Sequence, residues 1–179
     1  YENWSGGQNM FDNVDVVHKT YPDKNLIFTE GTAENFNRDR YQHWGNGERY
    51  GRSMIEDFNG GTVAWTDWNL LLDQTGGPNH VENFCFAPVH GDTSTGEVIY
   101  TPSYYFIGHF SKFIRVGAKR VNSVASRSQL LTTSFQNPDG QVATVVMNQS
   151  DKDVEYFLSI ATEAVKVTIP ARGIQTLVY

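Results

Sequence analysis

The chain has 179 residues, 39% of them hydrophobic, which suffices for one ordinary domain or two small ones with packed cores. It carries 14 Lys and Arg against 20 Asp and Glu, a formal net charge of -6, and its positive residues form no run longer than Lys119-Arg120. Nucleic acid is therefore not an expected partner, because phosphate binding requires a clustered basic face. No apolar run approaches the roughly 18 to 20 residues that span a bilayer, so no transmembrane segment is expected.

The first 117 residues alternate between helical and strand-like patterns. Three segments carry helical spacing of apolar residues or a helix-start signal: from Met10 to near Pro22, 46–58, and from Thr101 to a stop at Gly117. Two short apolar runs lie between them and predict strands buried on both faces, 25–30 and 62–65. Asn46 is the expected cap of the second helix, whose buried stripe is Tyr50, Met54 and Phe58.

Strict alternation of strand and helix implies parallel strands joined by crossover helices. Two strands cannot make a stable parallel sheet, since each would expose an apolar face and an unpaired edge. The remaining strands must come from residues outside this chain, and a whole (β/α)₈ barrel needs about 250 residues. Residues 1–117 are therefore expected to form the last quarter of a TIM barrel, and the chain to be the C-terminal part of a longer protein.

Residues 118–179 show period-two patterning instead. Six runs share it: 119–126, 130–137, 141–149, 153–160, 164–169 and 173–179. Several short strands at this spacing predict an antiparallel β-sandwich. Because these strands contain few aromatic residues and no paired carboxylates, the sandwich is expected to be structural.

Active sites of parallel α/β barrels lie at the carboxyl ends of the strands. Glu30 ends the first predicted strand, and Trp65, Asp67 and Trp68 surround the end of the second. Aromatic faces stack on sugar rings while carboxylates and amides bind hydroxyls, so these residues suit a sugar site. Glu30 in a structural ion pair and two tryptophans in the core are the alternatives, and Asp67 either binds sugar hydroxyls or braces its loop.

Other ionisable residues are not assigned to the chemistry. Four acidic residues are interpreted as solvated loop or helix charges: Glu34, Asp39, Glu48 and Asp57. No His, Asp or Glu cluster has metal-ligand spacing, so neither a catalytic metal nor a cofactor is expected.

Four segments then carry a family resemblance, in order and at fitting spacing over nearly the whole chain: 28–30 (FTE), 61–70 (GTVAWTDWNL), 76–84 (GGPN with NF) and 105–114 (YFIGHFSKFI). They resemble glycoside hydrolase family 30, and within it the glucosylceramidase-type branch. The resemblance implies a (β/α)₈ barrel joined to a β-sandwich, and hydrolysis of β-glycosides with retention of configuration.

The resemblance also implies roles for single residues. Glu30 matches the nucleophile, Trp65, Trp68 and Asn83 match positions that line the glycone pocket, and Tyr1 matches a tyrosine that hydrogen-bonds the nucleophile. The Asn-Glu-Pro motif of the general acid/base does not occur in this chain. The 179 residues alone are therefore expected to be inactive and to need the N-terminal part of the same enzyme as a partner.

The substrate is expected to be a β-linked glycoside or glycan. The favoured substrate is a glucosylceramide-like β-glucoside, followed by the β-1,6-glucan of an endo-β-1,6-glucanase and then by the substrates of a β-xylosidase. A different class of function, a noncatalytic carbohydrate-binding module, is the alternative. Loops 31–47 and 69–100 are expected to decide among the substrates. Asn3 and Asn148 begin N-x-S sequons, but such short matches arise often by chance and do not establish secretion. No compartment is assigned, and a secreted or periplasmic location is favoured over the cytoplasm.

Overall fold

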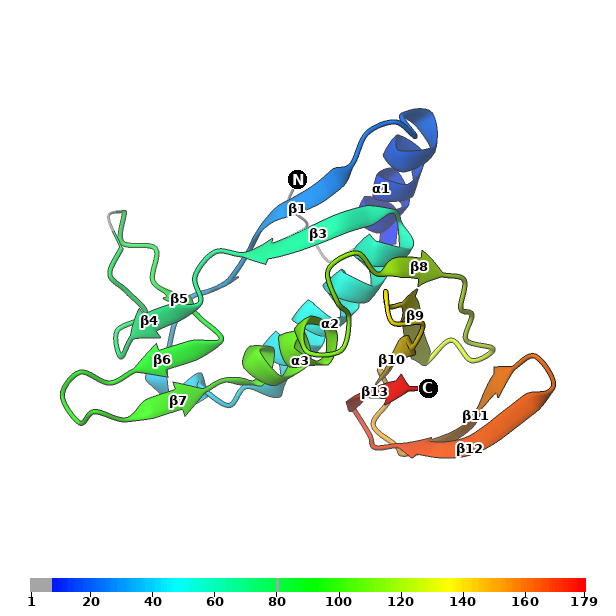
Figure 1. The fold of residues 1–179 in the computed structure, drawn as a ribbon. Coiled ribbons are helices and arrows are strands. Elements are labelled where there is room, and N and C mark those ends of the chain that lie inside the picture. The colour runs from blue at the N-terminus through cyan, green and yellow to red at the C-terminus, as the bar shows by residue number, and fades with distance from the viewer. Residues whose placement is uncertain (1–7, 80) are drawn as a thin grey trace. The chain divides into compact units, whose positions relative to one another are not determined.

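The computed structural model describes residues 8–79 and 81–179, which fall into two compact units that meet in sequence between Gly108 and His109 (Figure 1). This division lies inside a helix, and the domain boundary expected at residues 117 and 118 stays a prediction. The elements up to that helix are α1 (Gln8–Thr20), β1 (Leu26–Gly31), β2 (Ala33–Glu34), the 3-10 helix η1 (Arg38–Arg40), α2 (Trp44–Asn59), β3 (Thr62–Asp67), β4 (Leu71–Asp73), β5 (Cys85–Phe86), β6 (Val89–Gly91), β7 (Val98–Tyr100) and α3 (Pro102–Ser111).

β1 and β3 pair in parallel, which confirms the arrangement expected from the alternation of strands and helices. Leu26 pairs with Thr62 and Phe28 with Trp65, and the register shifts between Phe28 and Gly31. α2 connects the two strands and packs against β3 and α1 (Figure 1). Its apolar stripe forms much of the core of this unit, with Tyr50 3% and Ile55 0% exposed.

α2 begins earlier than expected. Trp44 is its first residue and His43 its N-cap, with no hydrogen bond from the His43 side chain. Asn46 lies in the first turn, so its assignment as the cap was wrong. The helix ends at Asn59, where Gly60 and Gly61 follow, and Gly61 has a φ of 102° that disfavours any residue with a Cβ.

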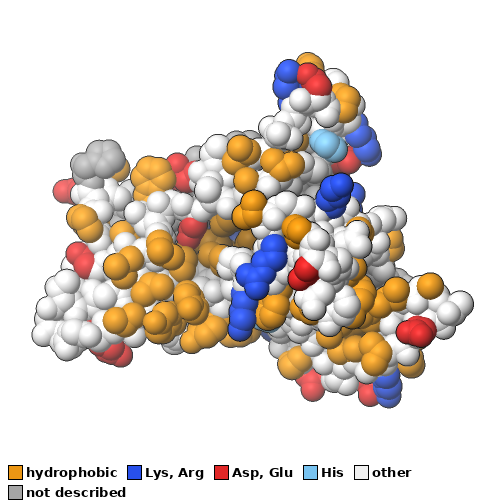
Figure 2. Space-filling model, viewed as in Figure 1, with side chains coloured by type: hydrophobic (Ala, Val, Ile, Leu, Met, Phe, Trp, Pro, Cys, Tyr) orange, Lys and Arg blue, Asp and Glu red, His pale blue; other side chains and the backbone are white. Residues whose placement is uncertain are grey.

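The segment 69–100 contains strands that the sequence did not indicate. β4, β6 and β7 form a three-stranded sheet in that order, in which β4 and β6 run parallel and β6 and β7 antiparallel. Leu72 and His90 are paired on its buried face, whereas Leu71 and Tyr100 lie exposed on the other. Figure 2 shows apolar side chains gathered over these strands. Strands of three residues are too short for a detectable period.

The second unit is antiparallel throughout its paired strands. Its strands are β8 (Lys119–Val121), β9 (Leu130–Gln136), β10 (Val142–Asn148), β11 (Val154–Ile160), β12 (Glu163–Ile169) and β13 (Ile174–Val178). A four-stranded sheet has the order β13-β10-β9-β8, and β11 and β12 form a separate hairpin. The expected strands are all present, but the first ends at Val121 because residues 122–126 do not pair.

The hairpin packs on the four-stranded sheet through one apolar cluster. Leu130 and Val146 come from the sheet, and Val154 and Ile169 from the hairpin. Ile169 is 0% exposed. This cluster joins the two layers of the predicted sandwich. In the described parts of the chain, no helix is both long and apolar enough to cross a membrane.

We expect Ile169→Ala to lower the free energy of unfolding by about 2–5 kcal/mol, because the lost side chain leaves a cavity between the two layers. Val165→Ala is the control, since Val165 lies on the same strand but is 56% exposed. It should change stability by about 0.5 kcal/mol. Urea unfolding followed by circular dichroism measures both, and equal effects would show that Ile169 is not a core residue.

Candidate active site

The ends of β1 and β3 lie side by side. Gly31 pairs with Asp67, and the backbone N–H of Trp68 donates to the carbonyl oxygen of Gly31 at 2.7 Å. Parallel strands end at the same edge of a sheet, so Glu30 and Trp68 are brought to one edge. Glu30 is half-buried, and the Trp68 side chain is 50% exposed. The structure thus places the expected carboxylate next to the strand end that carries an exposed indole.

Asp67 connects this edge to α2. Its Oδ1 accepts hydrogen bonds from the Tyr50 hydroxyl at 2.8 Å and from the Trp68 backbone N–H at 3.0 Å. Its Oδ2 is buried and has no hydrogen-bond partner among the described residues. Burial raises the pKa of Asp67 to about 7, although the bonds from Tyr50 and Trp68 oppose this shift. These contacts fit the alternative in which Asp67 braces its loop, and the role of Asp67 stays a prediction.

The indole of Trp65 packs against neighbouring protein groups. It stacks on Phe28, with ring centroids 4.7 Å apart, and its Nε1 donates to Asp57 Oδ2 at 3.0 Å. A Cβ at Gly31 would overlap the indole, so only glycine fits there. The assignment of Trp65 to the glycone pocket stays a prediction, because its observed neighbours are protein groups.

The interpretation of Asp57 as a solvated charge was wrong. Asp57 is 0% exposed and accepts hydrogen bonds from Trp65 and from the Ser53 hydroxyl at 3.1 Å. The sequence did contain a signal for the burial of Asp57. Asp57 follows Tyr50 by seven residues, which is two helical turns, so it lies on the buried face of α2.

Asn83 lies in an exposed loop and reaches the segment that follows β1. Its Nδ2 donates to Glu34 Oε1 at 3.3 Å, and its backbone N–H and carbonyl both bond to the side chain of Asn79. Glu34 is exposed, as expected of a solvated charge. Tyr1 lies outside the described residues, so its proposed hydrogen bond to Glu30 stays a prediction.

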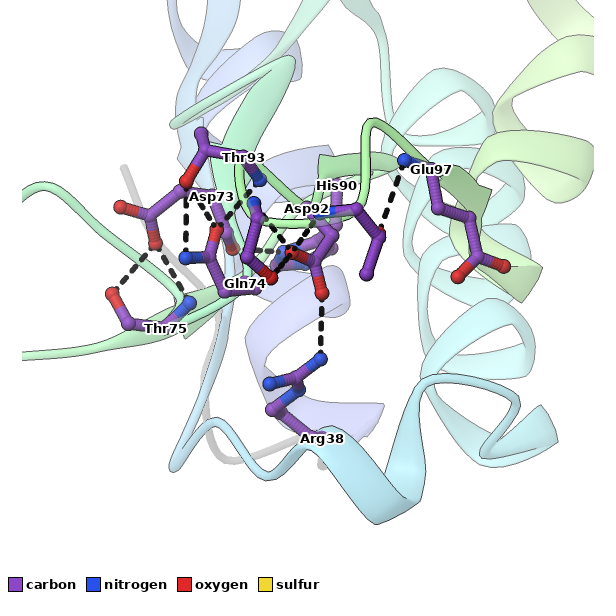
Figure 3. Close-up of polar contacts among 10 residues, drawn as sticks. Arg38, Asp73, Gln74, Thr75, His90, Asp92, Thr93 and Glu97 are labelled. Atoms are coloured by element: carbon purple, nitrogen blue, oxygen red, sulfur yellow. Dashed lines mark hydrogen bonds and ion pairs between the residues drawn. The ribbon is translucent and has the colours of Figure 1, made fainter.

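A polar network joins η1 to the three-stranded sheet and links the turns that follow β4 and β6 (Figure 3). The Arg38 guanidinium pairs with Asp92 at 2.7 Å, and hydrogen bonds from Ser94 are the main reason that the pKa of Asp92 is lowered. His90 Nε2 accepts from the Ala87 N–H at 2.9 Å, so its Nδ1 is the nitrogen that donates to the Asp73 carbonyl. Burial lowers the pKa of His90 and favours this neutral form.

The pocket between α2 and the two strands is too small for a sugar. Its lining residues are Phe28, Gly31, Thr32, Arg49, Tyr50, Ser53 and Trp65. Its volume of about 20 Å³ has room for one water molecule and not for a pyranose. In residues 8–79 and 81–179, His, Cys, Asp and Glu form no group of three that could hold a metal ion.

We expect Asp67→Asn to flatten the pH dependence of stability between about pH 4 and pH 7. With its pKa raised from 3.8 to about 7, the buried carboxyl keeps its proton where the unfolded chain has lost it. The protonated Asp67 carboxyl therefore contributes fully to the free energy of unfolding below about pH 4. This contribution falls by up to about 1.4 kcal/mol per pH unit as the pH rises to about 7. Asn does not titrate but keeps an oxygen for Tyr50 and Trp68.

Urea unfolding across this pH range measures the effect, with Asp39→Asn as the control because Asp39 is exposed. The control should keep the slope of the unchanged chain. A slope in Asp67→Asn equal to that of the unchanged chain would mean that Asp67 is ionised throughout the range.

Comparisons with known proteins agree with this geometry. The model of the glycosyl hydrolase family 30 TIM-barrel domain matches residues 4–114, and that of the family 30 beta sandwich domain matches residues 117–177. Lysosomal acid glucosylceramidase of Mus musculus is 38% identical over 147 residues, which are 80% of this chain and 28% of that protein. Putative glucosylceramidase 3 of Caenorhabditis elegans is 30% identical over 93% of this chain and 33% of that protein.

Solved structures give the same result. SrfJ from Salmonella typhimurium superposes with a TM-score of 0.90 at 32% identity, over 94% of this chain and 38% of that one. The endo-beta1,6-glucanase BT3312, at 24% identity, shares the fold with a TM-score of 0.82 over 93% of this chain and 38% of its own. The chain spans about a third of the length of these relatives, from 28% to 38%. It belongs to glycosyl hydrolase family 30 and comprises the C-terminal part of the family's TIM barrel followed by its β-sandwich domain.

Proposed function

We propose that this chain is the C-terminal part of a retaining β-glycoside hydrolase in which Glu30 is the nucleophile. The observation that carries the proposal is the position of Glu30 at the carboxyl edge of two parallel strands, next to the exposed indole of Trp68. Trp68 would stack on the glycone, and Asn83 would donate to a hydroxyl. In a family of glycosyl hydrolases, this edge is the place where substrate binds.

Retention of configuration requires two carboxyl groups about 5–5.5 Å apart. One attacks the anomeric carbon and forms a glycosyl ester, while the other protonates the departing oxygen and then activates water. Glu30 would be the first, and the second would come from the N-terminal part of the enzyme. The 179 residues alone would then hydrolyse no glycoside measurably, because general acid catalysis is worth about 10²–10⁴-fold and most of the glycone pocket is missing.

Among substrates, a glucosylceramide-like β-glucoside is favoured by the 38% identity to the mouse glucosylceramidase. A β-1,6-glucan is second, since an endo-beta1,6-glucanase has a similar structure, and a β-xyloside is third. The loops at 31–47 and 69–100, joined by the contact of Asn83 with Glu34, would select among them. A noncatalytic carbohydrate-binding module would use the same aromatic residues but would have no role for a strand-end glutamate.

Glu30→Gln in the full-length enzyme is expected to lower kcat on an aryl β-glucoside by about three orders of magnitude or more, because the amide cannot form the glycosyl ester. Substrate affinity should largely survive. Glu163→Gln is the matched control, since Glu163 is exposed on β12 of the second unit, which is expected to be structural. Activity of Glu30→Gln within tenfold of the unchanged enzyme would exclude Glu30 as the nucleophile. NMR of the first-formed sugar anomer would test retention separately.

Trp68→Ala is expected to weaken binding of a competitive glycone inhibitor by about 2–4 kcal/mol, through loss of stacking and packing. Phe157→Ala is the control, because Phe157 is an aromatic residue exposed at 65% on β11 of the second unit, which is expected to be structural. Calorimetric titration of the full-length variants measures both. An unchanged inhibitor affinity in a folded Trp68→Ala variant would place this indole outside the glycone pocket.

A further inference from the structure

The strand that carries Glu30 is irregular where Glu30 lies. The pairing of β1 with β3 shifts register between Phe28 and Gly31, so Glu30 falls within the shifted segment. Such irregularities redirect a side chain, but they also remove ladder hydrogen bonds that would fix the backbone. The contacts at both ends of this segment therefore contribute to fixing the position of Glu30.

Two hydrogen bonds from the β3 side hold those ends. Before Glu30, the Thr66 hydroxyl donates to the Phe28 carbonyl at 2.7 Å. After it, the Trp68 backbone N–H donates to the Gly31 carbonyl at 2.7 Å. The second bond links the residue next to Glu30 directly to the backbone of Trp68.

Asp67 orients the amide that makes this link. The same Trp68 N–H also points to Asp67 Oδ1 at 3.0 Å, and that oxygen is fixed from the other side by the Tyr50 hydroxyl at 2.8 Å. Tyr50 is 3% exposed, and its ring packs on Trp65, whose indole covers Gly31. The Asp67 carboxyl is thus anchored to α2 and the core rather than directed to solvent.

From this geometry we propose that Asp67 is a positioning residue of the nucleophile: anchored by Tyr50, it fixes the Trp68 amide that holds Gly31, and so sets the place of Glu30 without contacting the sugar. The inference rests on the proposed role of Glu30. In the competing role Asp67 binds a sugar hydroxyl, and the bond from Tyr50 would orient the carboxyl for that contact.

Covalent inactivation of the full-length enzyme by 2,4-dinitrophenyl 2-deoxy-2-fluoro-β-glucoside isolates the step at Glu30. A Glu30 oxygen forms a bond to the anomeric carbon, and dinitrophenolate leaves with the bonding electron pair. The leaving group needs no general acid, so the rate at saturation reports on the nucleophile. The concentration for half-saturation reports on sugar contacts.

Asp67→Ala should lower the saturating rate by about tenfold or more while half-saturation changes by about threefold or less, because displacement of a reacting atom mainly affects the chemical step. Asp67→Asn should restore the rate to within about threefold, since its amide oxygen accepts the same two bonds. Tyr50→Phe, which removes only a hydroxyl, should lower the rate by about threefold to tenfold. It also covers the case in which Asp67→Ala does not fold.

Peptide mapping of the unchanged enzyme tests the nucleophile role of Glu30 separately from the positioning role of Asp67. Labelling at another residue, or none, would overturn the role of Glu30 and with it this inference. With Glu30 labelled, an unchanged rate in Asp67→Ala or Tyr50→Phe would overturn the positioning role alone. A rise in half-saturation that is equal in Asp67→Asn and Asp67→Ala would identify Asp67 as a sugar ligand instead.

Discussion

The first unit depends on the parallel pairing of β1 with β3. Parallel strands cannot be joined by a tight turn, so the chain between them must form a crossover, which here includes α2. The pairing brings the carboxyl ends of both strands to one edge, where Glu30 and Trp68 lie although 37 residues separate them in sequence. Every other feature of the candidate site is arranged around this edge.

Buried polar groups near the carboxyl ends of β1 and β3 make the geometry of this edge specific. Asp57 and Asp67 are carboxyl groups in a part of the molecule where apolar residues would pack without a desolvation penalty. Each accepts hydrogen bonds from an aromatic side chain, Asp57 from Trp65 and Asp67 from Tyr50. These bonds are directional, whereas apolar contacts are not. The two aromatic rings are thereby held in one orientation, and the Trp65 ring in turn covers Gly31.

The second unit is organised mainly by hairpins, with β10 also paired to the more distant β13. Each of its hairpins joins strands that are adjacent in sequence, as in β9 with β10 and β11 with β12. The turn at Asn137 is also bonded to the residues just after α3, since its side chain donates to the Phe113 carbonyl and accepts from the Arg115 N–H at 2.9 Å each. Such short connections suit a structural domain, because they need few long-range contacts to define the register.

Much of this architecture follows from the sequence alone. The alternation of apolar residues determined the strands of the second unit, and the apolar runs at 25–30 and 62–65 determined the two parallel strands, because pattern and burial are coupled along each element. The motif around Glu30, Trp68 and Asn83 determined the family. Only the tertiary structure showed the burial of Asp57 and the contacts of Asp67 and Trp65. The identity of a residue does not reveal whether its side chain faces solvent, substrate or core. Asp67 bonds to Tyr50 and Trp65 stacks on Phe28, and both partners come from other elements. The short strands β4, β6 and β7 were likewise decided by their pairing in the folded chain, since three residues are too few to show a period.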